Sequence, residues 1–146
     1  MDKFGKSQPV KRVEDVRFLT GEGRYVDDIT PAGALHAYFF RSPVGHAVIT
    51  GLDVEDAAQA DGVHAVLTID DLEAAGMDIS MAGTILQNRD GTDAAKPLRP
   101  MLAKGRVRYV GEPVAVVIAD TLDQARDAAE LIVLDVEDLP TNMKLE

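Results

Sequence analysis

The chain has 146 residues, of which 46% are hydrophobic and 27% are charged, so it contains material for one core and one solvated surface. This balance excludes a disordered or fibrous chain, and the absence of cysteine excludes disulfides and thiolate metal ligands. The formal net charge of −10 disfavours nucleic acid as a partner, because most of the surface repels phosphates.

The first half of the chain predicts an arm followed by alternating strands and helices. Residues 1–30 are irregular, with a turn at residues 21–23 where two glycines accept positive φ at little cost. The predicted elements that follow are a strand at 34–40, a strand at 46–52, a helix at 54–60, a strand at 63–68 and a helix at 70–75. Both faces of the first strand are apolar, which predicts that both are covered. Asp53 is the predicted N-cap of the first helix.

The second half begins with residues 76–100, which have no periodicity and are too long for an ordinary connection, so we expect a segment that is mobile or docked. The predicted elements after it are strands at 107–110 and 113–119, a helix at 121–130 and a strand at 131–136. The 113–119 strand is almost wholly apolar, as a central buried strand is. Thr121 and Gln124 form a capping box. The helix has a predicted inner stripe of Leu122, Ala125 and Ala129, continued by Ile132. The order of elements predicts an α+β domain with a mixed sheet.

No residue pattern predicts catalysis, cofactor binding or metal binding. The three histidines, His36, His46 and His64, do not have the spacing of a local metal motif. The neighbouring acids at 14–15 and 27–28 are not juxtaposed dyads, because adjacent strand residues point to opposite faces. Met143–Lys144 is similar to a biotinyl attachment site, but the lysine lies two residues from the end rather than in a hairpin. No apolar run reaches the roughly 20 residues of a membrane span, and residues 1–10 do not form a secretory signal, so we expect a cytoplasmic protein.

A basic cluster follows the irregular segment and consists of Arg99, Lys104, Arg106 and Arg108. We expect these side chains to pair with acidic groups of the chain itself or of a partner. A nucleic-acid site is disfavoured, since only Tyr109 supplies an aromatic ring among them. Lys104, Arg106 and Arg108 are therefore candidate interface residues.

Read in order, short segments of the chain resemble the N-terminal α/β hammerhead domain of the large subunit of the xanthine dehydrogenase, aldehyde oxidase and carbon monoxide dehydrogenase family. The separate-subunit, carbon monoxide dehydrogenase-like branch is the most similar. The segments are RVED at 12–15, FLTGEGRYVDDI at 18–29, LHA at 35–37, RSP at 41–43, HA at 46–47, GVHAVLT at 62–68, VRYVGEPVA at 107–115, residues 125–131 and LP at 139–140. Within them Gly21, Gly23, Tyr25, Asp27, Gly111 and Pro113 are the candidate structural motif residues.

The resemblance implies an α/β hammerhead fold with two or three short helices packed on the sheet. It implies that the parent enzyme oxidises carbon monoxide, an aldehyde or a heterocycle at a molybdopterin cofactor, with iron–sulfur clusters and FAD on companion subunits. The family's cofactor-binding and catalytic segments lie downstream of this domain, so none is expected in this chain. The expected partners are those molybdenum-binding domains and the iron–sulfur and flavin subunits.

The resemblance divides the chain into a flexible arm at 1–11, a hammerhead domain at 12–140 with the irregular insertion at 76–100, and a tail at 141–146. Leu145–Glu146 resembles a vector-derived tail, so we expect a truncated domain that is inactive alone. Two alternatives stay open. One is a stand-alone assembly module that binds a partner subunit, and the other is a small biotinyl-type carrier.

Overall fold

The computed structural model describes residues 11–80, 86–94 and 99–142, and these form two units divided between Ala34 and Leu35. Three segments that the sequence analysis named lie wholly or partly outside the described residues. They are most of the arm at 1–11, parts of the 76–100 insertion, and Met143–Lys144 with the last two residues.

The first unit contains more regular structure than the irregular arm that the sequence predicts. Helix α1 spans Asp15–Leu19, and a 3-10 turn, η1, spans Val26–Asp28. Side chains close both turns, because the Thr20 hydroxyl donates to the Val16 carbonyl at 2.9 Å and the Tyr25 N–H donates to the Asp28 carboxylate at 2.8 Å. Such local bonds are not visible as hydrophobic periodicity, which explains why the prediction missed both elements.

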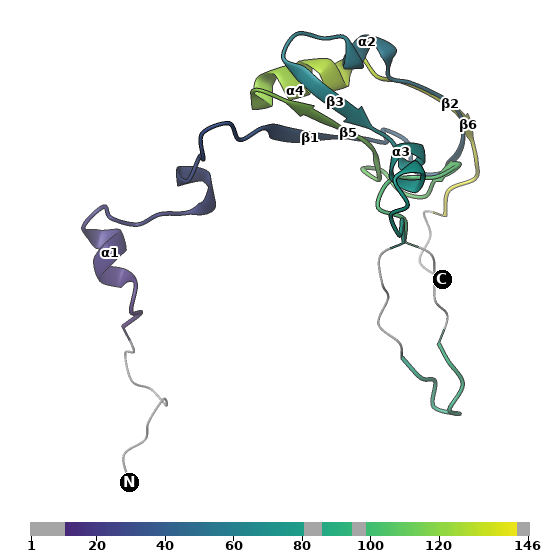
Figure 1. Cartoon of the computed structure of the whole chain (residues 1–146). Coiled ribbons are helices and arrows are strands. Elements are labelled where there is room, and N and C mark those ends of the chain that lie inside the picture. The colour runs from purple at the N-terminus through teal and green to yellow at the C-terminus, as the bar shows by residue number, and fades with distance from the viewer. Residues whose placement is uncertain (1–10, 81–85, 95–98, 143–146) are drawn as a thin grey trace. The chain divides into compact units, whose positions relative to one another are not determined.

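The second unit contains two three-stranded sheets and three short helices (Figure 1). Its elements are β1 (His36–Arg41), β2 (Ala47–Asp53), α2 (Glu55–Ala58), β3 (Val63–Leu67), α3 (Ile69–Ala74), β4 (Arg106–Val107), β5 (Pro113–Ala119), α4 (Leu122–Glu130) and β6 (Val133–Asp138). The strand orders are β1-β5-β3 and β4-β2-β6. The α+β fold class is thus confirmed. The single mixed sheet is wrong, because every strand pair among the described residues is antiparallel and the strands divide between two sheets.

Two apolar clusters hold this unit together. In the first, α2 and α4 pack on one face of the β1-β5-β3 sheet, with Val117 at its centre. Its fully enclosed members are small residues on β5 and the helices: Ala57, Ala115, Ala119, Ala125, Ala128 and Ala129. The second cluster joins Val114 of β5 to Val107 of β4 and Ala47 of β2, so β5 belongs to both clusters.

Strand β1 has one covered face rather than the two that were predicted. Phe39, on the face away from α4, is 43% exposed, and Leu35, on the same face by alternation, is 47% exposed. The reason is the packing of the helices, since α2 and α4 pack on the opposite face of the β1-β5-β3 sheet. An apolar composition on both faces did not show which face the helices would cover.

Three smaller predictions also need correction. Leu122 does not belong to the inner stripe of α4, since it is 36% exposed, and Ala128 is buried in its place. The predicted strand at 107–110 is shortened to Arg106–Val107, because the chain turns after Val107. The N-cap of α2 is Val54 rather than Asp53, although the Asp53 carboxylate still accepts the Glu55 N–H at 3.0 Å.

Candidate functional site

The basic cluster lies around the turn that leads into β5, and two of its side chains pair within the chain. Lys104 forms an ion pair with Glu73 of α3. Arg108 pairs with Glu112, which is only 4% exposed, at 3.2 Å between guanidinium and carboxylate. Arg106 is exposed on β4. Acidic groups of the chain itself thus pair with Lys104 and Arg108, while an interface role for Lys104, Arg106 and Arg108 stays a prediction.

The turn that contains Gly111 and Pro113 is joined to the end of β1 by three hydrogen bonds. Gly111 has φ +86° and donates its N–H to the Ser42 carbonyl at 2.8 Å, and Ser42 donates its own N–H to the Glu112 carbonyl at 2.9 Å. Arg41 Nη1 donates to the Gly111 carbonyl at 2.8 Å. Pro113, the first residue of β5, lies opposite Arg41 in the strand pair. The conformation at Gly111 favours glycine, since a side chain at positive φ is strained.

Two of the four motif candidates in the first unit, Tyr25 and Gly23, belong to or lie against one aromatic stack. The rings of Phe18 and Tyr25 are 5.4 Å apart and nearly parallel. A Cβ at Gly23 would lie 2.4 Å from Cδ1 of Phe18, so the backbone passes too close to the ring for any side chain. Gly21 has φ +75°, and Asp27 is exposed within η1. A structural role for these four residues stays a prediction.

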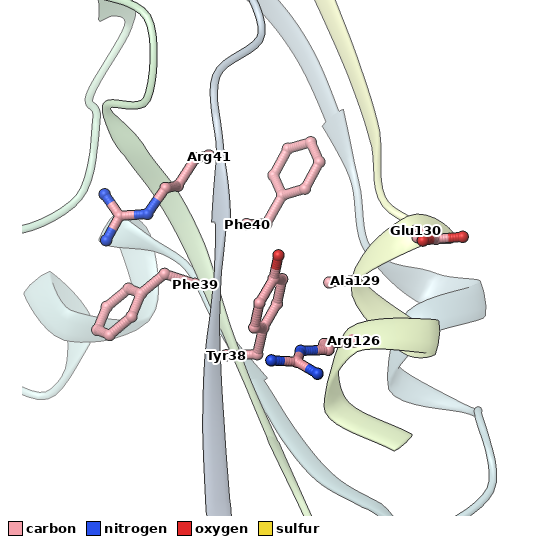
Figure 2. A pocket seen from close by; sticks show the side chains of 7 residues that line it. All are labelled: Tyr38, Phe39, Phe40, Arg41, Arg126, Ala129 and Glu130. Atoms are coloured by element: carbon pink, nitrogen blue, oxygen red, sulfur yellow. The ribbon is translucent and has the colours of Figure 1, made fainter. Parts of the chain in front are cut away.

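A hollow of about 280 Å³ lies between β1 and α4, and sequence reasoning did not find it. Figure 2 shows Tyr38 and Phe40 on the α4 side of β1 and Phe39 on the opposite side. Arg126 of α4 lies over the Tyr38 ring at 5.9 Å, and Arg41 lies over the Phe39 ring at 5.7 Å. The signal that could have indicated it is the run of three aromatic residues at 38–40 in a chain with only seven aromatic residues, three Tyr and four Phe.

A second hollow, of about 470 Å³, lies where β2 and β6 approach the end of the described chain. His46 and Arg108 line it, and His46 Nδ1 is 2.8 Å from the Pro140 carbonyl. The Arg108 guanidinium is already paired with Glu112. The remaining lining residues are Gly45, Val110, Pro140, Thr141 and Asn142.

The three histidines lie on different strands or at the start of one. His36 is in β1, His46 contacts the Pro140 carbonyl, and His64 Nε2 lies 2.8 Å from Asp120 Oδ1. Within residues 11–80, 86–94 and 99–142, no group of three or more His, Cys, Asp or Glu side chains could hold a metal ion. No helix in the described part of the chain is long and apolar enough to cross a membrane.

Two carboxyl groups have perturbed acidity, and both belong to local turns. The Thr68 hydroxyl and then the Thr68 N–H, both donating to Asp71, hold the pKa of Asp71 below its ordinary value. The Thr92 hydroxyl and N–H do the same to the pKa of Asp90. Both effects stabilise the ionised form by hydrogen bonding, which is the chemistry of caps and turns rather than of a catalytic acid.

Comparisons with known proteins agree on one family. Residues 20–140 match the model described as aldehyde oxidase and xanthine dehydrogenase, a/b hammerhead domain. The chain is 45% identical over 138 residues to the nicotine 6-hydroxylase large subunit of Paenarthrobacter nicotinovorans, covering 93% of this chain and 16% of that protein. The chain is thus about one sixth as long as this relative.

Solved structures give the same result. The crystal structure of quinoline 2-oxidoreductase from Pseudomonas putida 86 superposes with a TM-score of 0.80 and 40% identity, over 90% of this chain and 16% of that one. The crystal structure of the Cu,Mo-CO dehydrogenase superposes with a TM-score of 0.73 and 37% identity, over 90% of this chain and 15% of that one.

Proposed function

The chain belongs to the a/b hammerhead domain family of aldehyde oxidase and xanthine dehydrogenase, and from this premise we propose that it is the structural hammerhead domain of the large subunit of a molybdopterin-dependent hydroxylase or dehydrogenase. In this role the domain supplies a folded scaffold and interfaces. The reacting groups belong to the remainder of the large subunit. The whole enzyme would oxidise carbon monoxide, an aldehyde or a heterocycle.

One observation carries the proposal: the match spans residues 20–140, yet the chain covers about one sixth of the nicotine 6-hydroxylase large subunit and of the quinoline 2-oxidoreductase chain. The matched region contains both sheets, both apolar clusters and helix α4. A folded core that matches one sixth of a longer chain is typical of one domain of a larger subunit.

The cofactor and partners of the whole enzyme follow from the same proposal. The large subunit would bind molybdopterin in its other domains, and companion subunits would carry iron–sulfur clusters and FAD. The names of the relatives, a Cu,Mo dehydrogenase and a large subunit, support this arrangement. We expect the assembled enzyme in the cytoplasm, with this domain packed on the molybdenum-binding domains through the insertion at 76–100 and the basic cluster.

A domain exchange tests the proposal. This chain replaces the matching 138-residue region in the large subunit of nicotine 6-hydroxylase from Paenarthrobacter nicotinovorans, which is 45% identical there. We expect the chimera to assemble with its companion subunits and to retain nicotine hydroxylation, whereas deletion of the region abolishes assembly. The isolated chain should show no turnover with an artificial electron acceptor and no bound molybdopterin.

Two results would count against the proposal. Turnover or bound molybdopterin in the isolated chain would place chemistry within the domain. Failure of the chimera to assemble, combined with binding of the isolated chain to companion subunits, would instead support a stand-alone assembly module. Intact-mass measurement separates both from a biotinyl-type carrier, which would show a mass increase on one lysine.

A further inference from the structure

The outer edge of β1 is open for hydrogen bonding with another strand. Strand β1 pairs with β5 through His36–Ala119 to Arg41–Pro113, and no described strand pairs with its other edge. The six residues contain neither proline nor lysine, which commonly protect open edges. Because the ladder groups of an open edge bind the backbone of an extended chain, the ligand that this edge fits is a polypeptide strand.

The side chains beside this edge define the chemistry of that strand. Tyr38 faces the α4 side of β1 and Phe39 faces the other side, and both rings are partly exposed (Figure 2). Aromatic residues at such positions favour apolar or β-branched neighbours on an added strand. An arginine lies over each ring, with Arg126 5.9 Å from Tyr38 and Arg41 5.7 Å from Phe39.

Arg126 and Arg41 are the two bases among the described residues that line the hollow, in a chain of net charge −10. Among the described residues, Arg126 pairs with the exposed Asp123 at 3.6 Å, and its side chain is 54% exposed. Arg41 donates from Nη1 to the Gly111 carbonyl, and a guanidinium has five N–H donors. Each guanidinium therefore has more donors than the one acceptor named for it, and Glu130 is the sole acid among the described residues that line the hollow.

The spacing along β1 gives a register. Tyr38 and Arg41 are three residues apart and point to opposite sides of the sheet (Figure 2). Arg126 lies over the ring of Tyr38. Residues of an added strand directly opposite these two positions are likewise three apart and on opposite faces. Carboxylates at those two positions would face Arg126 and Arg41.

We propose that the open edge of β1 binds an extended segment from the remainder of the large subunit, with β-branched residues and two carboxylates three positions apart. The source of the segment rests on the proposed function. This contact is separate from the insertion and the basic cluster, and it anchors the domain by backbone pairing.

The test uses the ¹⁵N-labelled chain and the capped peptide TEVTEVT as the probe. We expect amide shifts that centre on β1 and α4, slower hydrogen exchange in β1, and weaker binding at high salt. The peptide TKVTKVT should bind about tenfold more weakly, because like charges repel. A version of TEVTEVT that is N-methylated at alternate residues should not bind, because it cannot pair along its backbone.

Variants locate the charge contribution. Arg126→Gln should weaken TEVTEVT binding about threefold, as expected for loss of one half-exposed ion pair. Arg17→Gln on α1, at an exposed position in the first unit, is the matched control and should leave the affinity unchanged. A peptide with both glutamates on one face, TEVEVTT, should bind as weakly as TEVTEVT binds to Arg126→Gln.

Three outcomes would overturn the proposal: equal binding of the acidic and lysine peptides, undiminished binding of the N-methylated peptide, or no binding of TEVTEVT. Protection of β1 that rises with chain concentration, without peptide, would assign the edge to a second copy and would also overturn it. None of these outcomes affects assembly of the domain-exchange chimera, so failure of this inference and failure of the proposed function are distinguishable.

Discussion

The carboxylate of Glu112 accepts two hydrogen bonds from Arg108, one from its backbone N–H at 2.5 Å and one from Nη1 at 3.2 Å. Within the part of the chain that the structure describes, the buried polar residues are Glu112 and Ser42, and Ser42 is bonded to the same turn. Charge-assisted bonds of this kind are roughly twice as strong as neutral ones. The pair therefore fixes the turn that joins the two sheets through β4 and β5.

Glu112→Ala should destabilise the chain by about 1–3 kcal/mol, because the N–H of Arg108 loses its partner in a partly buried turn. Urea unfolding followed by circular dichroism measures the change. Glu137→Ala, at an exposed position on β6, is the control and should fall within about 0.5 kcal/mol of the parent chain. Equal midpoints for the two variants would show that the Arg108–Glu112 pair does not stabilise the fold.

The start of α4 depends on one hydroxyl. Thr121 Oγ1 accepts the Gln124 N–H at 3.2 Å, which is one of the two backbone bonds of the predicted capping box. The Gln124 side chain accepts from the Thr121 hydroxyl at 2.9 Å instead of from the Thr121 N–H. Thr121→Ala should cost about 1 kcal/mol, and Thr121→Ser should retain most of the stability. Thermal unfolding of both variants checks the difference. A Thr121→Ser variant as unstable as Thr121→Ala would assign the effect to the threonine methyl group instead.

The elements with strong local signals were predictable from the sequence. The boundaries of β5 are those that its apolar run predicts, and α4 begins at the residue after Thr121. Gly62 and Gly76 both have positive φ, and each follows a predicted helix. Here local preference and tertiary packing favour the same structure.

The sheet arrangement and the hollow beside β1 were not predictable, because they depend on pairing between distant segments. No local pattern of residues predicts that β2 pairs with β6 in a sheet separate from β1 and β5. Arg126 and Tyr38 are 88 positions apart, so no spacing rule brings the guanidinium over the ring. The sequence predicts that Lys104 and Arg108 pair with acidic groups, but it does not predict which ones. The structure shows that the partners are Glu73 and Glu112.

Asp71 should titrate below its ordinary pKa of 3.8 in the folded chain, because Thr68 donates both its hydroxyl and its N–H to the carboxylate. A lowered folded pKa gives stability that is present above the unfolded pKa and is lost as pH falls through the folded value. Carbon-detected NMR titration of Asp71 measures its pKa directly.

Thr68→Val removes the hydroxyl and keeps the N–H, so it should raise the pKa of Asp71 toward 3.8. Thr50→Val, at an exposed position on β2, should leave the titration midpoint of Asp71 unchanged. If Thr68→Val also left it unchanged, the backbone N–H alone would account for the lowered pKa.

Gly23→Ala should disrupt the stack of Phe18 on Tyr25, because the added methyl carbon would lie 2.4 Å from the Phe18 ring. The ring protons of Tyr25 report this change through their NMR shifts, which move when a neighbouring ring is displaced. Glu22→Ala, at an exposed position in the same unit, is the control for a substitution without the clash. Similar Tyr25 shifts in both variants would contradict a specific role for Gly23.

The two faces of β5 should respond differently to the same truncation. Val117 is fully buried beneath α4 and α2, whereas Val116, which lies opposite Phe39 and Leu67, is only partly buried. Val117→Ala should cost about 2 kcal/mol, because it removes two carbons and leaves a cavity that small alanine neighbours cannot fill. Val116→Ala should cost about half as much, since solvent already reaches that face. Urea midpoints for the pair measure the asymmetry, and equal losses would mean that the outer face of the sheet is as well packed as the face beneath α4.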